Sequence, residues 1–194
     1  WKDKDALNNI IKNLHQSFKQ FGTPELLEFL SPYQTPGYTK EKFFEQYQIF
    51  EKKMRRYTKM KIAIVNGYTM KSRDKDFLFS TIDDIASLRN TCKELKLNLK
   101  LLVDFTDKNK RNKIKKNMND MVNTLASMRN FIIGIHINEI DSWSTSSQIY
   151  YSTDRQRFIN TMDYPTVSTF MAGLTTILQD SRSRYLIPNA VKNR

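Results

Sequence analysis

The feature that most constrains the fold is a set of short apolar runs, most of them ending in polar residues, that alternate with helix-like stretches. The runs cover residues 61–66 (KIAIVN), 99–104 (LKLLVD), 131–137 (FIIGIHI) and 184–187 (RYLI). Runs of this length, bounded by polar or turn residues, are typical of strands buried in a parallel sheet. They predict an α/β fold: a parallel sheet of βα units, forming either part of a TIM-barrel-like structure or an open sheet.

Helical patterns fill the intervals between these runs. Apolar residues at helical spacing predict helices over 5–21, 39–57, 81–97, 109–128 and 167–178. Ser80 with Asp83 resembles a capping box, and Thr23-Pro24-Glu25 predicts the start of a short helix ending near Ser31. We therefore expect residues 1–37 to form an N-terminal helical extension and residues 38–194 to form the βα domain.

The length and the first residue favour a part of a larger protein. A complete barrel of eight βα units typically needs about 250 residues, and this chain of 194 residues starts at Trp1, not at Met. The lone Cys92 excludes intrachain disulfides and Cys-rich zinc sites. Cysteine usage and the lack of a visible signal peptide favour an intracellular protein, and no run of apolar residues predicts a membrane span.

Polar residues at the ends of the apolar runs are the candidates for a site. In barrels and open α/β sheets, ligands bind at the carboxyl ends of the strands. Asn66, Asp104 and His136 hold such positions, and Glu139 follows the third run. Each has a structural alternative: Asn66 in a turn, Asp104 as the cap of the next helix, and His136 as a core histidine. Glu139 is harder to explain without a partner or solvent.

Three phrases resemble the early βα units of glycoside-hydrolase-type TIM barrels. They are YTKEKFFEQYQIFEKKMRRYTKMKIAIVNGYT, IDDIASLRNTCKELKLNLKLLVDF and NFIIGIHINEI, within about half of the chain. The resemblance implies a carbohydrate-active hydrolase in which Glu139 is the general acid/base and Asn138 binds the sugar 2-hydroxyl. Trp143 would stack on a sugar face, with Asp104 or Asp141 in support. The strand RYLIPN carries no acid at its end, where such a mechanism needs a second carboxylate.

LLVDFTD and GIHINE also resemble xylose-isomerase-like barrels, a group that includes endonucleases. The Glu ligands usual in that group are missing at Val65 and near Pro188. No phosphate-binding glycine loop or His-Glu-x-x-His motif occurs. We expect no cofactor, although Asp104, His136 and Glu139 leave open a mixed site for a divalent cation.

The net charge of +12 points to a different class of partner, nucleic acid or another polyanion. The basic segment DKNKRNKIKK follows the second apolar run, at the end of the sheet where the candidate site lies. Its candidate polyanion-binding residues are Lys110, Arg111, Lys113, Lys115 and Lys116. The alternative is a solvated helix start. A third hypothesis is a non-catalytic interaction domain that contacts other domains of a larger protein.

Overall fold

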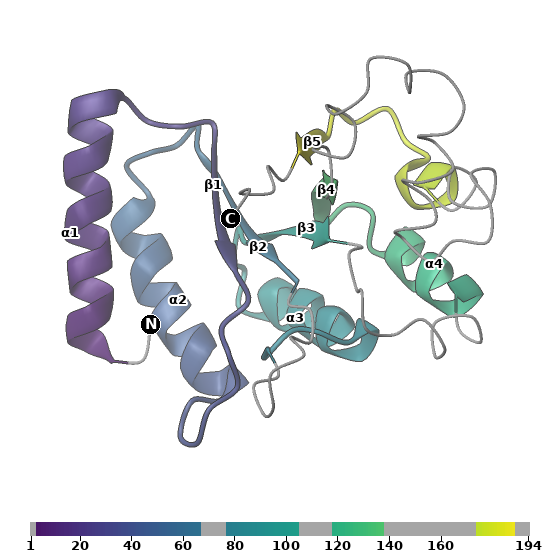
Figure 1. Cartoon of the computed structure of the whole chain (residues 1–194), viewed down its shortest axis with the longest axis horizontal. Helices are drawn as coiled ribbons and strands as arrows, with labels where there is room; N and C mark the ends of the chain where they lie inside the picture. Colours follow the sequence, from purple (N-terminus) through teal and green to yellow (C-terminus); the bar gives the residue numbers. More distant parts are fainter. Residues whose placement is uncertain (1–2, 67–76, 105–117, 138–173, 189–194) are drawn as a thin grey trace, which may run out of the picture. The chain divides into compact units, whose positions relative to one another are not determined.

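The computed structural model describes residues 3–66, 77–104, 118–137 and 174–188 (Figure 1). By their internal contacts, residues 1–67 and 72–100 form one compact unit, and residues 68–71 and 101–194 form a second. The fold is α/β, as predicted, and the strand order of its five-stranded sheet is β1-β2-β3-β4-β5, the order of the chain. No helix within the described ranges is both long and apolar enough to cross a membrane.

The first unit begins with a long helix and a short strand. Helix α1 (Lys4–Phe21) starts where Asp3 accepts a hydrogen bond from the Ala6 amide, at 2.7 Å, and it ends at Gly22 with a φ of 87°. Strand β1 (Leu26–Leu30) follows. The helix predicted after Pro24 is therefore wrong, although residues 5–21 form the predicted helix.

Pairing with a distant strand explains this difference. Strand β1 runs parallel to β2 (Lys61–Val65), and the two are joined at their ends by backbone hydrogen bonds. The Lys61 amide donates to the Glu25 carbonyl at 2.8 Å, and the Ser31 amide donates to the Val65 carbonyl at 2.9 Å. Hydrogen bonds to a partner strand 35 residues along the chain outweigh the local helix-start signals, because local propensity is a weak determinant beside tertiary pairing.

Helix α2 (Lys40–Met54) supplies the aromatic core of the first unit. It lies between α1 and β1 (Figure 1). The Phe43 ring lies 6.4 Å from Phe29 of β1 and 5.1 Å from Phe79, measured between ring centroids. Glu51, on the same helix, is buried and accepts a hydrogen bond from the Asn98 amide at 2.8 Å. The buried residues of this helix are Phe43, Phe44, Gln46, Tyr47, Phe50, Glu51 and Met54.

Helix α3 (Ile82–Glu94) closes the first unit and is capped one residue later than predicted. The capping box is formed by Thr81 and Asp84, not by Ser80 and Asp83: the Thr81 hydroxyl accepts from the Asp84 amide at 3.1 Å, and Asp84 accepts from the Thr81 amide at 3.0 Å. Lys40 forms an ion pair with Asp84. The start of α3 is thereby tied to the start of α2.

The second unit contains the predicted strands β3 (Lys100–Asp104), β4 (Ile132–Ile137) and β5 (Tyr185–Pro188). Neighbouring strands in this group run parallel. Helix α4 (Met118–Ser127) confirms the described part of the helix predicted over 109–128, and residues 174–178 are helical within the predicted 167–178. The remaining parts of those two predictions lie outside the described residues.

Candidate active site at the carboxyl ends of the strands

Two of the predicted catalytic residues are brought together in the second unit. Asp104 is the last residue of β3, and its register partner in β4 is His136. Register partners on neighbouring parallel strands lie about 4.8 Å apart and point to the same face of the sheet. Asp104 is 9% exposed and His136 is 4% exposed. A carboxylate and an imidazole therefore lie side by side, nearly out of water, at the carboxyl ends of two strands.

An irregularity in the strand pairing creates this arrangement. Leu101 pairs with Ile132, but Leu102 pairs with Gly134, so the register passes over Ile133. Without that shift, Asp104 would pair with Ile135, and His136 would point to the opposite face, because side chains alternate along a strand. The extra residue in β4 is what places the imidazole beside the carboxylate.

Arg184 holds the backbone next to this irregularity. Its Nε donates to the Ile132 carbonyl at 3.1 Å, and an Nη donates to the Arg129 carbonyl at 3.1 Å. The guanidinium also forms an ion pair with Asp180, which holds the pKa of that carboxyl well below its usual range. Arg129 in turn donates to the Gln179 carbonyl at 2.8 Å. Charge-assisted hydrogen bonds of this kind are among the stronger ones in proteins, so they hold the first residues of β4 and β5 in place.

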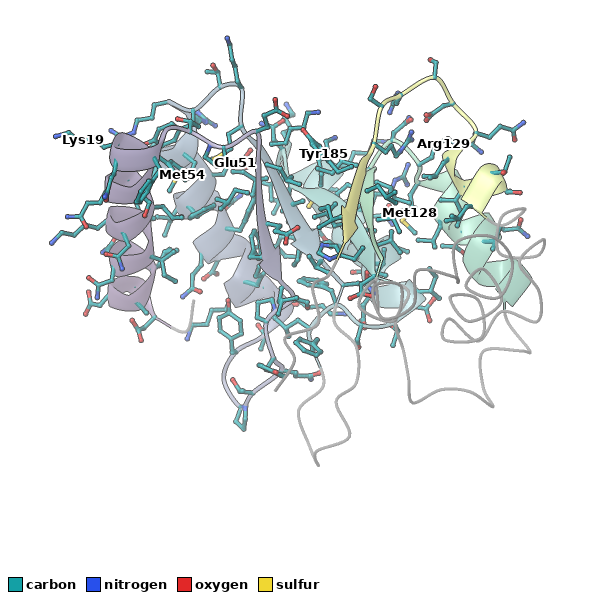
Figure 2. The ribbon with its side chains drawn as sticks, turned by 45° about the horizontal axis from the view of Figure 1, so that its top comes forward. Lys19, Glu51, Met54, Met128, Arg129 and Tyr185 are labelled. Atoms are coloured by element: carbon teal, nitrogen blue, oxygen red, sulfur yellow. The ribbon has the colours of Figure 1, made fainter. Side chains whose placement is uncertain are left out.

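Close packing at Gly134 supports Asp104 and His136 on the same face of the sheet. Gly134 lies two residues before His136 and therefore on the same face of β4, in register with Leu102 and Tyr185. A Cβ atom at Gly134 would come within 2.6 Å of the Tyr185 carbonyl oxygen and 2.7 Å of Leu102 Cδ2. Figure 2 labels Tyr185 on β5. The row Leu102-Gly134-Tyr185 is thus filled, and the row above it carries Asp104 and His136.

The other predicted site residues are distributed as follows. Asn66, in the first unit, directly follows β2 and is 8% exposed, so it is a buried polar residue at a strand end, as predicted. The predicted substrate-binding and acid/base residues Asn138, Glu139, Asp141 and Trp143 lie outside the described residues. So do the predicted polyanion-binding residues Lys110, Arg111, Lys113, Lys115 and Lys116.

A metal site receives no support from the part of the chain that the structure describes. Within it, no group of three or more His, Cys, Asp or Glu side chains is placed to hold a metal ion. The third member of the mixed cation site considered above, Glu139, lies outside this part. Cys92 is buried, and burial raises the pKa of its thiol to about 12, so it is not an activated nucleophile.

A second polar feature, in the first unit, was not predicted from the sequence. An open groove of about 760 Å³ lies between α1 and the end of α2. His15 lies in it, with Nδ1 2.9 Å from the Tyr57 hydroxyl. Burial, Arg56 and Lys53 lower the pKa of His15. The sequence signal that could have identified the groove is the placement of Lys12, His15 and Lys19 along one side of a helix.

Comparisons with known proteins do not extend these assignments. No protein-family model matches the chain, and no curated protein matches it.

Proposed function

We propose that the chain carries a carbohydrate-active hydrolase site at the carboxyl ends of β3 and β4. The observation that supports this proposal is the placement of Asp104 and His136 on one face of neighbouring parallel strands, both nearly buried. Ligands of parallel α/β folds bind at this end of the sheet. If Asp104 were only a helix cap and His136 only a core histidine, neither role would require the register shift that brings the two side chains to one face.

Glycoside hydrolysis assigns a role to each group. It requires one carboxylic acid that protonates the leaving oxygen and one carboxylate that acts as a base or nucleophile. In this proposal Glu139 is the acid/base, as the resemblance implies, and Asp104 or Asp141 supplies the second carboxylate. His136 would donate a hydrogen bond that orients the Asp104 carboxylate. Asn138 would bind the sugar 2-hydroxyl and Trp143 would stack on the sugar face.

The test is a hydrolysis assay on a panel of nitrophenyl glycosides and soluble polysaccharides. Glu139→Gln and Asp104→Asn keep the shape of each side chain and remove its acid/base capacity, so we expect roughly a hundredfold or greater loss of kcat for each. Asp83→Asn is the matched control, because Asp83 is an exposed acid on α3. Loss of activity in the control, or full activity in both site variants, would refute the assignment, as would a panel on which the wild-type protein hydrolyses nothing.

A second candidate function is supported by the net charge of +12, for which a neutral sugar gives no reason. In that alternative the segment 107–116 binds the phosphates of a nucleic acid, and the Asp104–His136 end of the sheet would lie next to a phosphodiester. Incubation with single-stranded RNA and DNA distinguishes the two candidates. Cleavage that is lost in Asp104→Asn supports the alternative, and intact nucleic acid alongside glycoside hydrolysis excludes it.

A further inference from the structure

We infer that the groove between α1 and the end of α2 is a binding site for single-stranded nucleic acid, separate from the candidate active site and independent of the proposed hydrolase function. The groove has a volume of about 760 Å³ and lies wholly within the first unit. This volume is within the range of sites that hold a small ligand or a short piece of a larger one. Its lining residues are Asn8, Ile11, Lys12, His15, Gln16, Phe18, Lys19, Lys53, Arg56 and Tyr57.

The positive charge of the groove favours an anionic ligand. Four of its lining residues are cationic and none is acidic. Lys12, Lys19 and Lys53 form no ion pair with any residue that the structure describes, so their charges are not neutralised within that part of the chain. Lys12 and Lys19 are two helical turns apart, about 10 Å along α1, and Lys19 lies near the carboxyl end of that helix (Figure 2). The cations therefore form a track and not a single point.

Helix ends alone do not explain this concentration of charge. Basic residues in the last turn of a helix interact favourably with its dipole, which accounts for Lys19 and Lys53 taken singly. Arg56, directly after the C-cap residue Arg55 of α2, is favoured in the same way, whereas Lys12 is in the middle of α1 and gains no comparable benefit. Four cations around one recess repel one another. Burial, and after it the charges of Arg56 and Lys53, lower the pKa of His15, so these two cations act on a ring inside the groove.

The groove also contains aromatic side chains, which suit a ligand with flat rings. The Phe18 ring contacts the Tyr57 ring edge-on, with centroids 4.9 Å apart, and the His15 ring lies 5.6 Å from Tyr57. The Arg56 guanidinium lies 5.1 Å from the centroid of the Tyr57 ring. One turn beyond Phe18, Phe21 is 78% exposed. Cationic grooves interleaved with aromatic rings are the recognition surface of proteins that bind single strands, in which phosphates follow the charges and bases stack on the rings.

Two other occupants fit less well. An acidic peptide would use the cations but would give the aromatic rings no partner. An anionic membrane needs several apolar side chains that project from the surface. Phe21 is one such side chain beside the groove, whereas Phe18 and Tyr57 line the recess. A single-stranded nucleic acid uses both the charges and the rings.

The test measures fluorescence anisotropy with a labelled oligothymidylate of eight nucleotides and an abasic oligomer of the same length. The groove variants are the doubles Lys12→Gln/Lys19→Gln and Lys53→Gln/Arg56→Gln. The matched control is Lys42→Gln/Lys93→Gln, which removes two exposed lysines of the same unit outside the groove. Circular dichroism checks that each variant is folded, and the segment 107–116 is unchanged in all of them.

We expect each groove double to weaken oligothymidylate binding by about tenfold and to lower the salt slope by roughly 1.4, from about 0.7 for each lost phosphate contact. The control should bind within twofold of the wild-type protein. Oligothymidylate should bind at least threefold more tightly than the abasic oligomer, which carries the same phosphates and no bases. Equal losses in groove and control variants, equal binding of the two oligomers, or tighter binding to phosphatidylserine vesicles or polyglutamate would each overturn the inference. Failure of the hydrolase proposal would leave these outcomes unchanged.

Discussion

Replacing Gly134 by Ala tests the packing that supports Asp104 and His136. The new Cβ would meet the Tyr185 carbonyl oxygen at 2.6 Å, Leu102 Cδ2 at 2.7 Å and Tyr185 Cβ at 2.9 Å. Two of these three atoms belong to the backbone or to the first side-chain carbon of β5, so they cannot rotate away. Leu102 is fully buried and has little room to change its rotamer. The strands must therefore separate by several tenths of an ångström.

We expect Gly134→Ala to lower the free energy of unfolding by about 3 kcal/mol, at the upper end of the usual cost of overpacking. Equilibrium unfolding in urea, followed by circular dichroism, measures this change as a shift of the midpoint at unchanged slope. Leu186→Ala is the control on the same strand, because Leu186 is 65% exposed, and it should cost less than about 1 kcal/mol. A loss below about 0.5 kcal/mol in Gly134→Ala would refute the close approach of β4 and β5 and the register derived from it.

Three further predictions concern charge. Burial raises the pKa of Asp84, but hydrogen bonds from Lys40 and Thr81 outweigh burial and lower the pKa below its ordinary value of 3.8. The wild-type protein should therefore be more stable than Asp84→Asn at pH values above 3.8. Urea unfolding should show this advantage disappear as the pH falls through the lowered pKa. Phosphate bound in the groove should favour protonated His15 against the effects of burial, Arg56 and Lys53, which lower its pKa. Lys12, Lys19 and Tyr57 line the same groove. Oligothymidylate affinity, measured by anisotropy, should rise from pH 8 to pH 6 and should rise less in His15→Gln. Changing Lys110, Arg111 and Lys113 together to Ala should lower the salt slope of polyanion binding by roughly one unit for each lost phosphate contact, and an unchanged slope would make that segment a solvated face.

The order of strands and helices in the βα domain could be predicted from the sequence because it depends on local hydrophobic patterns. The strands at 61–65, 100–104 and 132–137 are predominantly apolar, with polar residues mainly at or near their ends, and α2 shows one continuous aromatic stripe. Strand β1 could not be predicted in this way. Leu26–Leu30 follows a Thr-Pro-Glu helix-start signal, and its conformation is decided by hydrogen bonds to β2, which lies far along the chain.

The candidate site was predictable in its position but not in its geometry. Asp104 and His136 follow or end apolar runs, so their placement at strand ends followed from the pattern. Whether they share a face depends on the shift at Ile133, which leaves no mark on hydrophobic periodicity. The groove depends on the packing of α1 against the end of α2, and its cations are separated by some forty residues, so only the folded chain brings Lys12 near Arg56.

The most direct test of the account is a nuclear magnetic resonance measurement of the two imidazole rings. The chain has only two histidines, His15 and His136, so ring ¹⁵N correlations give two sets of signals, assigned by their loss in single Gln variants. If Asp104 and His136 are neighbours on one face, Asp104→Asn must shift the ring resonances of His136 and leave those of His15 in place, while Asp83→Asn must move neither. His136 signals that do not respond to Asp104→Asn would contradict the pairing and, with it, the proposed site.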